Sequence, residues 1–95
     1  MKKITQKLLK LGVRPNYTGF KYLEVAIKYY LDHIKEVVRI MKVYEHTAKE
    51  FNTSRSIVER AIRHAKENCS DKQYKYMTAG RFIATIATEL QYEKV

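Results

Sequence analysis

Charged and polar side chains recur at helical spacing between Arg55 and Lys66. Arginine can donate two hydrogen bonds to guanine, and a carboxylate can accept one from cytosine, so such side chains suit the reading of base edges in the major groove. At about 100° per residue, the apolar residues of this stretch lie within about 50° of one direction, and the charged ones point away from them. The candidate DNA-binding residues are Ser54, Arg55, Ser56, Glu59, Arg60, Arg63, His64 and Lys66.

Glu59 has two interpretations. An acid in a phosphate-binding helix is electrostatically unfavourable unless it reads a base or orients an arginine. It can instead form an intrahelical ion pair with Arg55 or Arg63, each four residues away. The residues leave both interpretations open, whereas Arg60 is most simply interpreted as a base contact.

These side chains need a helix-turn-helix to carry them, and the sequence predicts one over about 43–67. A first helix, 43–51, is expected to bury Tyr44, Thr47, Ala48 and Phe51. Asn52 tolerates positive φ in the turn, and Ser54 or Thr53 caps a second helix that runs to about Asn68. Ala48 is small enough for the two helices to cross closely. The apolar face of the second helix consists of Val58, Ala61, Ile62 and Ala65.

Helical patterns also cover the flanking segments. Residues 3–11 form an amphipathic helix that Gly12 ends. A long helix starts at Thr18 or Gly19, and its apolar stripe continues to Met41 with a break somewhere in 32–42. Residues 69–77 are expected to be a loop, and Thr78 caps a last helix over 79–92. The fold class is therefore all-α, a compact bundle of about five to six helices containing a helix-turn-helix.

Composition limits the class of protein. Ninety-five residues predict one domain, 1–95, and a net charge of +9 favours a polyanionic partner. Five basic residues and no acid within 1–20 indicate either a second phosphate-contacting region or a solvated helix face. The single cysteine, Cys69, is expected to be buried and fits a reducing compartment. No apolar run long enough for a membrane helix or a leader peptide is present, so we expect a cytoplasmic protein without a membrane partner.

Catalytic chemistry has little support in the sequence. His33, His46 and His64 lack the spacing of a metal site. There is no glycine-rich phosphate loop and no paired carboxylate with an obvious pocket. We therefore predict no catalytic residue, no metal, no cofactor and no enzymatic activity.

The run NTSRSIVERAIRHA, residues 52–65, resembles the C-terminal effector domain of stage 0 sporulation protein A, a sporulation response regulator. The likeness extends to LGV at 11–13, GFKYLEVAI at 19–27, AKEFN at 48–52 and FIATIATEL at 82–90. The resemblance implies an all-helical domain whose recognition helix enters the major groove at a TGTCGAA-like box, often in tandem copies. It also implies that Glu59 and Arg60 read bases, with Ser56, Arg63 and His64 at the same surface.

Three departures from that family stand out. No receiver domain precedes the effector-like region in this sequence, so we expect either a domain cut out of a longer protein or a small stand-alone relative, and this chain itself is not expected to be switched by aspartyl phosphorylation. Ile57 stands where the family has a basic residue, which weakens a phosphate contact or alters base preference. The connection between the recognition helix and the last helix is shorter, which affects dimer contacts.

Two functions remain open. The first is a sequence-specific, double-stranded-DNA-binding transcriptional regulator, with a homodimer or tandem copies on DNA and RNA polymerase as further candidate partners. The second is a protein-interaction module that pairs with a full-length response regulator without reading DNA. Tyr74, Tyr76 and Tyr92 are the exposed aromatic residues expected to serve such a contact.

Overall fold

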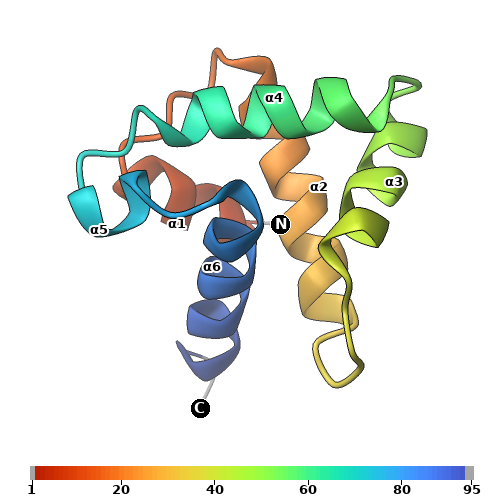
Figure 1. The fold of residues 1–95 in the computed structure, drawn as a ribbon. Helices are drawn as coiled ribbons and strands as arrows, with labels where there is room; N and C mark the ends of the chain where they lie inside the picture. Colours follow the sequence, from red (N-terminus) through yellow and green to blue (C-terminus); the bar gives the residue numbers. More distant parts are fainter. Residues whose placement is uncertain (1, 94–95) are drawn as a thin grey trace.

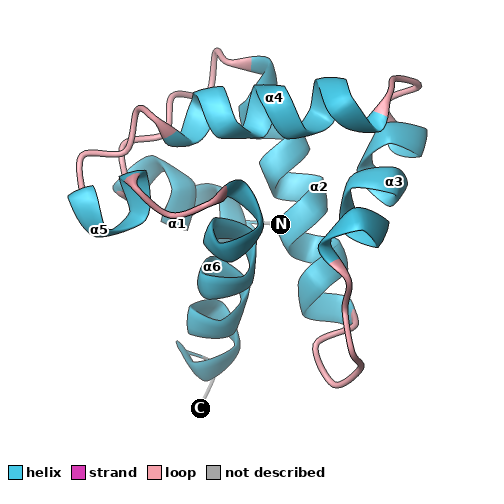
Figure 2. Cartoon of the chain, viewed as in Figure 1, coloured by secondary structure: helices cyan, strands magenta, loops and turns pink. Residues whose placement is uncertain are grey.

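The computed structural model describes residues 2–93, which form helices joined by turns and loops, with no strand in that range (Figure 1; Figure 2). This confirms the all-α class and the expected number of helices. The elements are α1 (Lys2–Lys10), α2 (Thr18–Asp32), α3 (Ile40–Glu50), α4 (Arg55–Lys66), α5 (Lys72–Lys75) and α6 (Ala79–Glu93).

The first helix ends at Lys10, and Gly12 follows it at the C′ position predicted for it. Gly12 has a φ of 93°, a conformation that a glycine adopts without steric cost. The Gly12 N–H donates to Leu9 O at 3.1 Å and the Val13 N–H donates to Leu8 O at 3.0 Å, which is the Schellman pattern. Ile4 and Leu8 are buried, so α1 packs through its apolar side.

The break in the long helical pattern lies at residues 33–39. α2 ends at Asp32, and His33 donates its backbone N–H and directs Nδ1, at 2.8 Å, to the same Tyr29 carbonyl oxygen. α3 begins at Ile40, three residues earlier than predicted. The apolar stripe does not continue to Met41, because that residue belongs to the next helix and is 46% exposed.

α4 lies across the ends of α2 and α3 and also contacts α6 (Figure 1). Its buried side chains meet those of the other helices in a single core. Fully buried members of that core include Leu23, Ile27, Val43, Val58, Ile62, Phe82, Ile83 and Ile86. The helices beneath α4 therefore support it along its length and leave its other side free.

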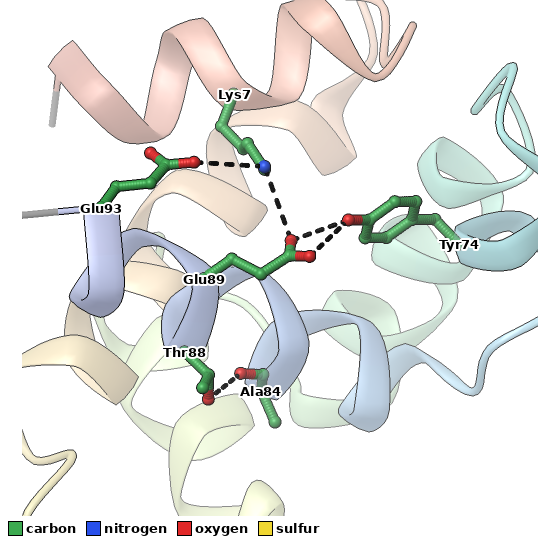
Figure 3. Close-up of polar contacts among 6 residues, drawn as sticks. All are labelled: Lys7, Tyr74, Ala84, Thr88, Glu89 and Glu93. Atoms are coloured by element: carbon green, nitrogen blue, oxygen red, sulfur yellow. Dashed lines mark hydrogen bonds and ion pairs between the residues drawn. The ribbon is translucent and has the colours of Figure 1, made fainter.

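The segment 69–77 was expected to be a loop, and that is wrong for four of its residues. The Asp71 carboxylate accepts the Gln73 N–H at 2.9 Å and caps the short helix α5. Tyr74 is buried, and its hydroxyl donates to the Glu89 carboxylate at 2.6–2.8 Å, an arrangement drawn in Figure 3. Cys69 is buried as predicted, and burial raises the pKa of its thiol to about 11.

Lys7 of α1 completes the polar cluster around Glu89. Its ammonium lies 3.5 Å from Glu89 and 3.5 Å from Glu93, both on α6 (Figure 3). The cluster joins α1, α5 and α6. Thr78 caps α6 as predicted, because its hydroxyl accepts the Arg81 N–H at 3.2 Å. Over residues 2–93, no helix combines the length and the apolar character needed to cross a bilayer.

Candidate nucleic-acid interface

The turn between α3 and α4 has the local backbone conformation that the predicted helix-turn-helix requires. Asn52 has a φ of 53°, the left-handed conformation predicted for it. The Thr53 N–H donates to Ala48 O at 2.9 Å and the Asn52 N–H donates to Lys49 O at 3.3 Å, so a Schellman motif ends α3. Ser54, rather than Thr53, caps α4, because its hydroxyl accepts the Ile57 N–H at 3.3 Å.

One side of α4 anchors it to the core. Val58, Ile62 and Ala65 are fully buried, and Ala61 is half-buried. These are the residues that the helical spacing placed on the inner side. The orientation of α4 is therefore the one that the sequence predicted.

We call the opposite side the outer face of α4; it consists of Arg55, Ser56, Glu59, Arg60, Arg63 and His64. All of these are exposed except Glu59, which is half-buried. Within residues 2–93 the Arg60 guanidinium has no ion-pair partner, so its donors are available to a ligand. The structure thus brings most of the predicted residues together on one surface, with the capping residue Ser54 at its end.

Two ion pairs lie along the edge of the outer face that borders α3. Arg63 Nη1 lies 3.6 Å from Glu59 Oε1, which is the intrahelical ion pair considered for Glu59. Arg55 Nη1 lies 3.4 Å from Glu45 Oε1 on α3. Burial, and then the negative charge of Glu59, raise the pKa of Tyr44 to about 12. In the unbound protein Glu59 therefore forms the intrahelical ion pair with Arg63.

The other edge of the outer face borders the start of α2. His64 meets Tyr17 edge to face, with ring centroids 5.5 Å apart. Arg60 and His64 line an open groove of about 480 Å³ together with the segment 16–19 and Ile57. The sequence predicted only the end of a turn and the start of a helix at 16–19. The signal that could have identified it is Gly19, a small residue where α2 must pass close to another helix.

Lys66 does not belong to the outer face. It is 5% exposed, and its ammonium donates to the Lys75 carbonyl oxygen at 2.5 Å. The prediction that Lys66 contacts DNA is therefore corrected. Its side chain turns toward α5, where the last carbonyl groups of a helix attract a cation. Of the basic residues near the N-terminus, Lys7 is engaged by α6, whereas Lys2, Lys3, Lys10 and Arg14 are exposed.

The described residues contain no group of three or more His, Cys, Asp or Glu side chains placed to hold a metal ion. A family model described as "Sporulation initiation factor Spo0A C terminal" matches residues 4–91. The chain belongs to this family. The match covers nearly the whole sequence and confirms the resemblance that the run at 52–65 indicated. The Spo0A C-terminal family consists of DNA-binding effector domains of transcription regulation in sporulation, which favours a non-enzymatic role.

Proposed function

We propose that this domain binds double-stranded DNA sequence-specifically, with α4 in the major groove. The observation that carries the proposal is the outer face of α4, where Arg60 and its neighbours are exposed while Val58 and Ile62 hold the helix to the core. In helix-turn-helix proteins the second helix lies in the major groove and the first crosses the backbone. α4 and α3 take these two positions.

Within that interface we assign separate roles. Arg60 reads guanine, because its guanidinium is exposed and has no ion-pair partner within residues 2–93. Glu59 reads a base or keeps Arg63 oriented toward a phosphate. Arg55, Ser56 and His64 contact the backbone beside them. The target that the family resemblance suggests is a TGTCGAA-like box.

A selection of duplexes from a random pool, near physiological salt, tests this function and defines the box. Arg60→Ala is expected to lose about 1–3 kcal/mol of preference for the box over a scrambled duplex. Arg39→Ala is a matched control, because it removes the same charge at the exposed N-cap of α3, where the side chain makes no capping hydrogen bond. Equal binding of box and scrambled duplex by the unmodified protein would refute the proposal.

The second candidate is pairing with a full-length regulator, which the exposure of Tyr76 (76%) and Tyr92 (72%) favours. These two tyrosines do not make one patch. Tyr76 precedes α6 and Tyr92 lies in its last turn, about 20 Å away along the helix axis. Tyr74 is buried and does not contribute. Capture of a regulator at a salt concentration that removes DNA would support this function.

A further inference from the structure

Ile57 is a large apolar side chain at the edge of a polar surface. It is 49% exposed, in the first turn of α4, with Ser54 and Ser56 before it and Arg60 after it. Its N–H donates to the Ser54 hydroxyl at 3.3 Å, which fixes the backbone at this position. A β-branched side chain in a helix has one strongly preferred χ1 rotamer, so Ile57 presents a defined apolar shape.

The position of Ile57 relative to Arg60 is the informative feature. Ile57, Arg60 and His64 follow one another at i, i+3 and i+7, so they form a row along α4. All three line the groove that the start of α2 closes on its other side. Residues in the first turns of a recognition helix are those that contact base edges. A duplex that brings a base edge to Arg60 therefore brings an adjacent base edge to Ile57.

Only one group on a base edge matches an isoleucine. In the major groove, guanine, adenine and cytosine present hydrogen-bond donors or acceptors, whereas thymine also presents its C5-methyl group. An apolar side chain pressed against a donor or acceptor removes it from water without giving it a partner, which is unfavourable. Contact between two apolar groups removes both from water and is favourable.

We propose that Ile57 is a specificity residue that contacts the C5-methyl group of a thymine beside the base pair read by Arg60. This inference rests on the proposed function, because it requires α4 in the major groove. The exposure of Ile57 is not the only ground for this inference, since its position on α4 beside Arg60 is also needed. Val37 is 95% exposed, but it lies in the 33–39 loop beyond the C-terminal end of α2, whereas the N-terminal end of α2 packs against α4.

The test replaces each thymine of the selected box, one at a time, by deoxyuridine. Deoxyuridine keeps every hydrogen-bonding group of thymine and lacks only the methyl. One replacement is expected to weaken binding by about fourfold, the equivalent of about one methylene left in water. Ile57→Ala should bind the thymine and deoxyuridine duplexes equally at that position, while Val37→Ala should keep the full difference.

The outcomes separate the two proposals. If the unmodified protein prefers the box and no deoxyuridine replacement weakens binding, the role of Ile57 is refuted and the proposed function stands. If Ile57→Ala keeps the fourfold difference, another residue contacts the methyl and the inference is again refuted. If the unmodified protein does not distinguish the box from a scrambled duplex, the proposed function itself fails.

Discussion

A Cβ atom added to Gly19 would lie 2.2 Å from the carbonyl oxygen of Ala61, and 2.7 Å from the Cβ of Ala65. α2 and α4 therefore approach each other as closely as their backbones allow. Contacts at this crossing set how closely α4, the helix that carries Arg60, packs on α2. Gly19 is thus a positioning residue for the outer face, although it lies outside the helix-turn-helix.

Gly19→Ala is expected to lower the free energy of unfolding by about 1–3 kcal/mol, the usual cost of overpacking a dense contact. The clashing atom is a backbone oxygen, which cannot rotate away. Urea denaturation monitored by circular dichroism measures the change. Gly80→Ala is the matched control: its Cβ would lie 2.9 Å from Ile40 Cγ1, a smaller overlap than at Gly19 and with a side chain instead of the backbone, so a smaller loss is expected. Equal losses for the two variants would contradict the argument.

The turn of the helix-turn-helix gives a second prediction. Asn52 has a φ of 53°, where alanine is strained and glycine is not. We expect Asn52→Ala to reduce stability by about 1 kcal/mol and Asn52→Gly to leave stability nearly unchanged. Thermal unfolding of the two variants beside the unmodified protein checks this. A loss as large for glycine as for alanine would show that the asparagine side chain, and not the backbone conformation, is what the turn requires.

Most of the helix-turn-helix could be predicted from local chemistry. Asn52, Ser54 and the spacing of Val58, Ile62 and Ala65 each act within a few residues of one another, and the structure agrees with all of them. The start of α3 was harder to place. No glycine or proline marks residues 33–39, and α2 ends at the C-cap residue His33, whose backbone N–H and ring Nδ1 both contact the Tyr29 carbonyl oxygen, a contact that helical spacing does not predict.

The errors in the candidate site have a different physical origin. Lys66 and Tyr74 look like surface residues in the sequence, because a lysine in a last turn and a tyrosine in a polar stretch are usually exposed. Their partners are 9 and 15 residues away, the Lys75 carbonyl and the Glu89 carboxylate. Helical periodicity describes neighbours on one helix only. It carries no information on how α5 folds back over the end of α4.

The different environments of Arg63 and Lys66 predict different salt dependences of DNA binding. Arg63 is exposed on the outer face, whereas the ammonium of Lys66 is held by Lys75. The plot of log K against log salt concentration has a negative slope, and removing one phosphate contact makes that slope shallower by about 1. We expect that change for Arg63→Gln and none for Lys66→Met, which should instead reduce stability. Anisotropy titrations over a salt series measure both slopes. A shallower slope for Lys66→Met as well would show that Lys66 contacts a phosphate, against this prediction.

The hydrogen bond between Tyr74 and Glu89 predicts a dependence of stability on pH. This bond, and then burial, raise the pKa of Tyr74 from 10.0 to about 12 in the folded protein. Below pH 10 the phenol is protonated in both the folded and the unfolded chain. As pH rises from 10 to 12, the unfolded chain releases its proton first, so unfolding becomes more favourable and the stabilisation is lost.

Tyr74→Phe removes both the hydrogen bond and the titrating group. At pH 7 it is expected to be less stable by about 1 kcal/mol, and the difference from the unmodified protein should shrink as pH rises through the interval 10–12. Urea denaturation over a pH series measures this difference, which cancels the titration of the lysines common to both proteins. Tyr92→Phe is the control, because Tyr92 is 72% exposed, and no difference is expected there. Parallel stability curves for the unmodified protein and Tyr74→Phe would contradict the raised pKa, since they would mean that Tyr74 ionises equally in both states.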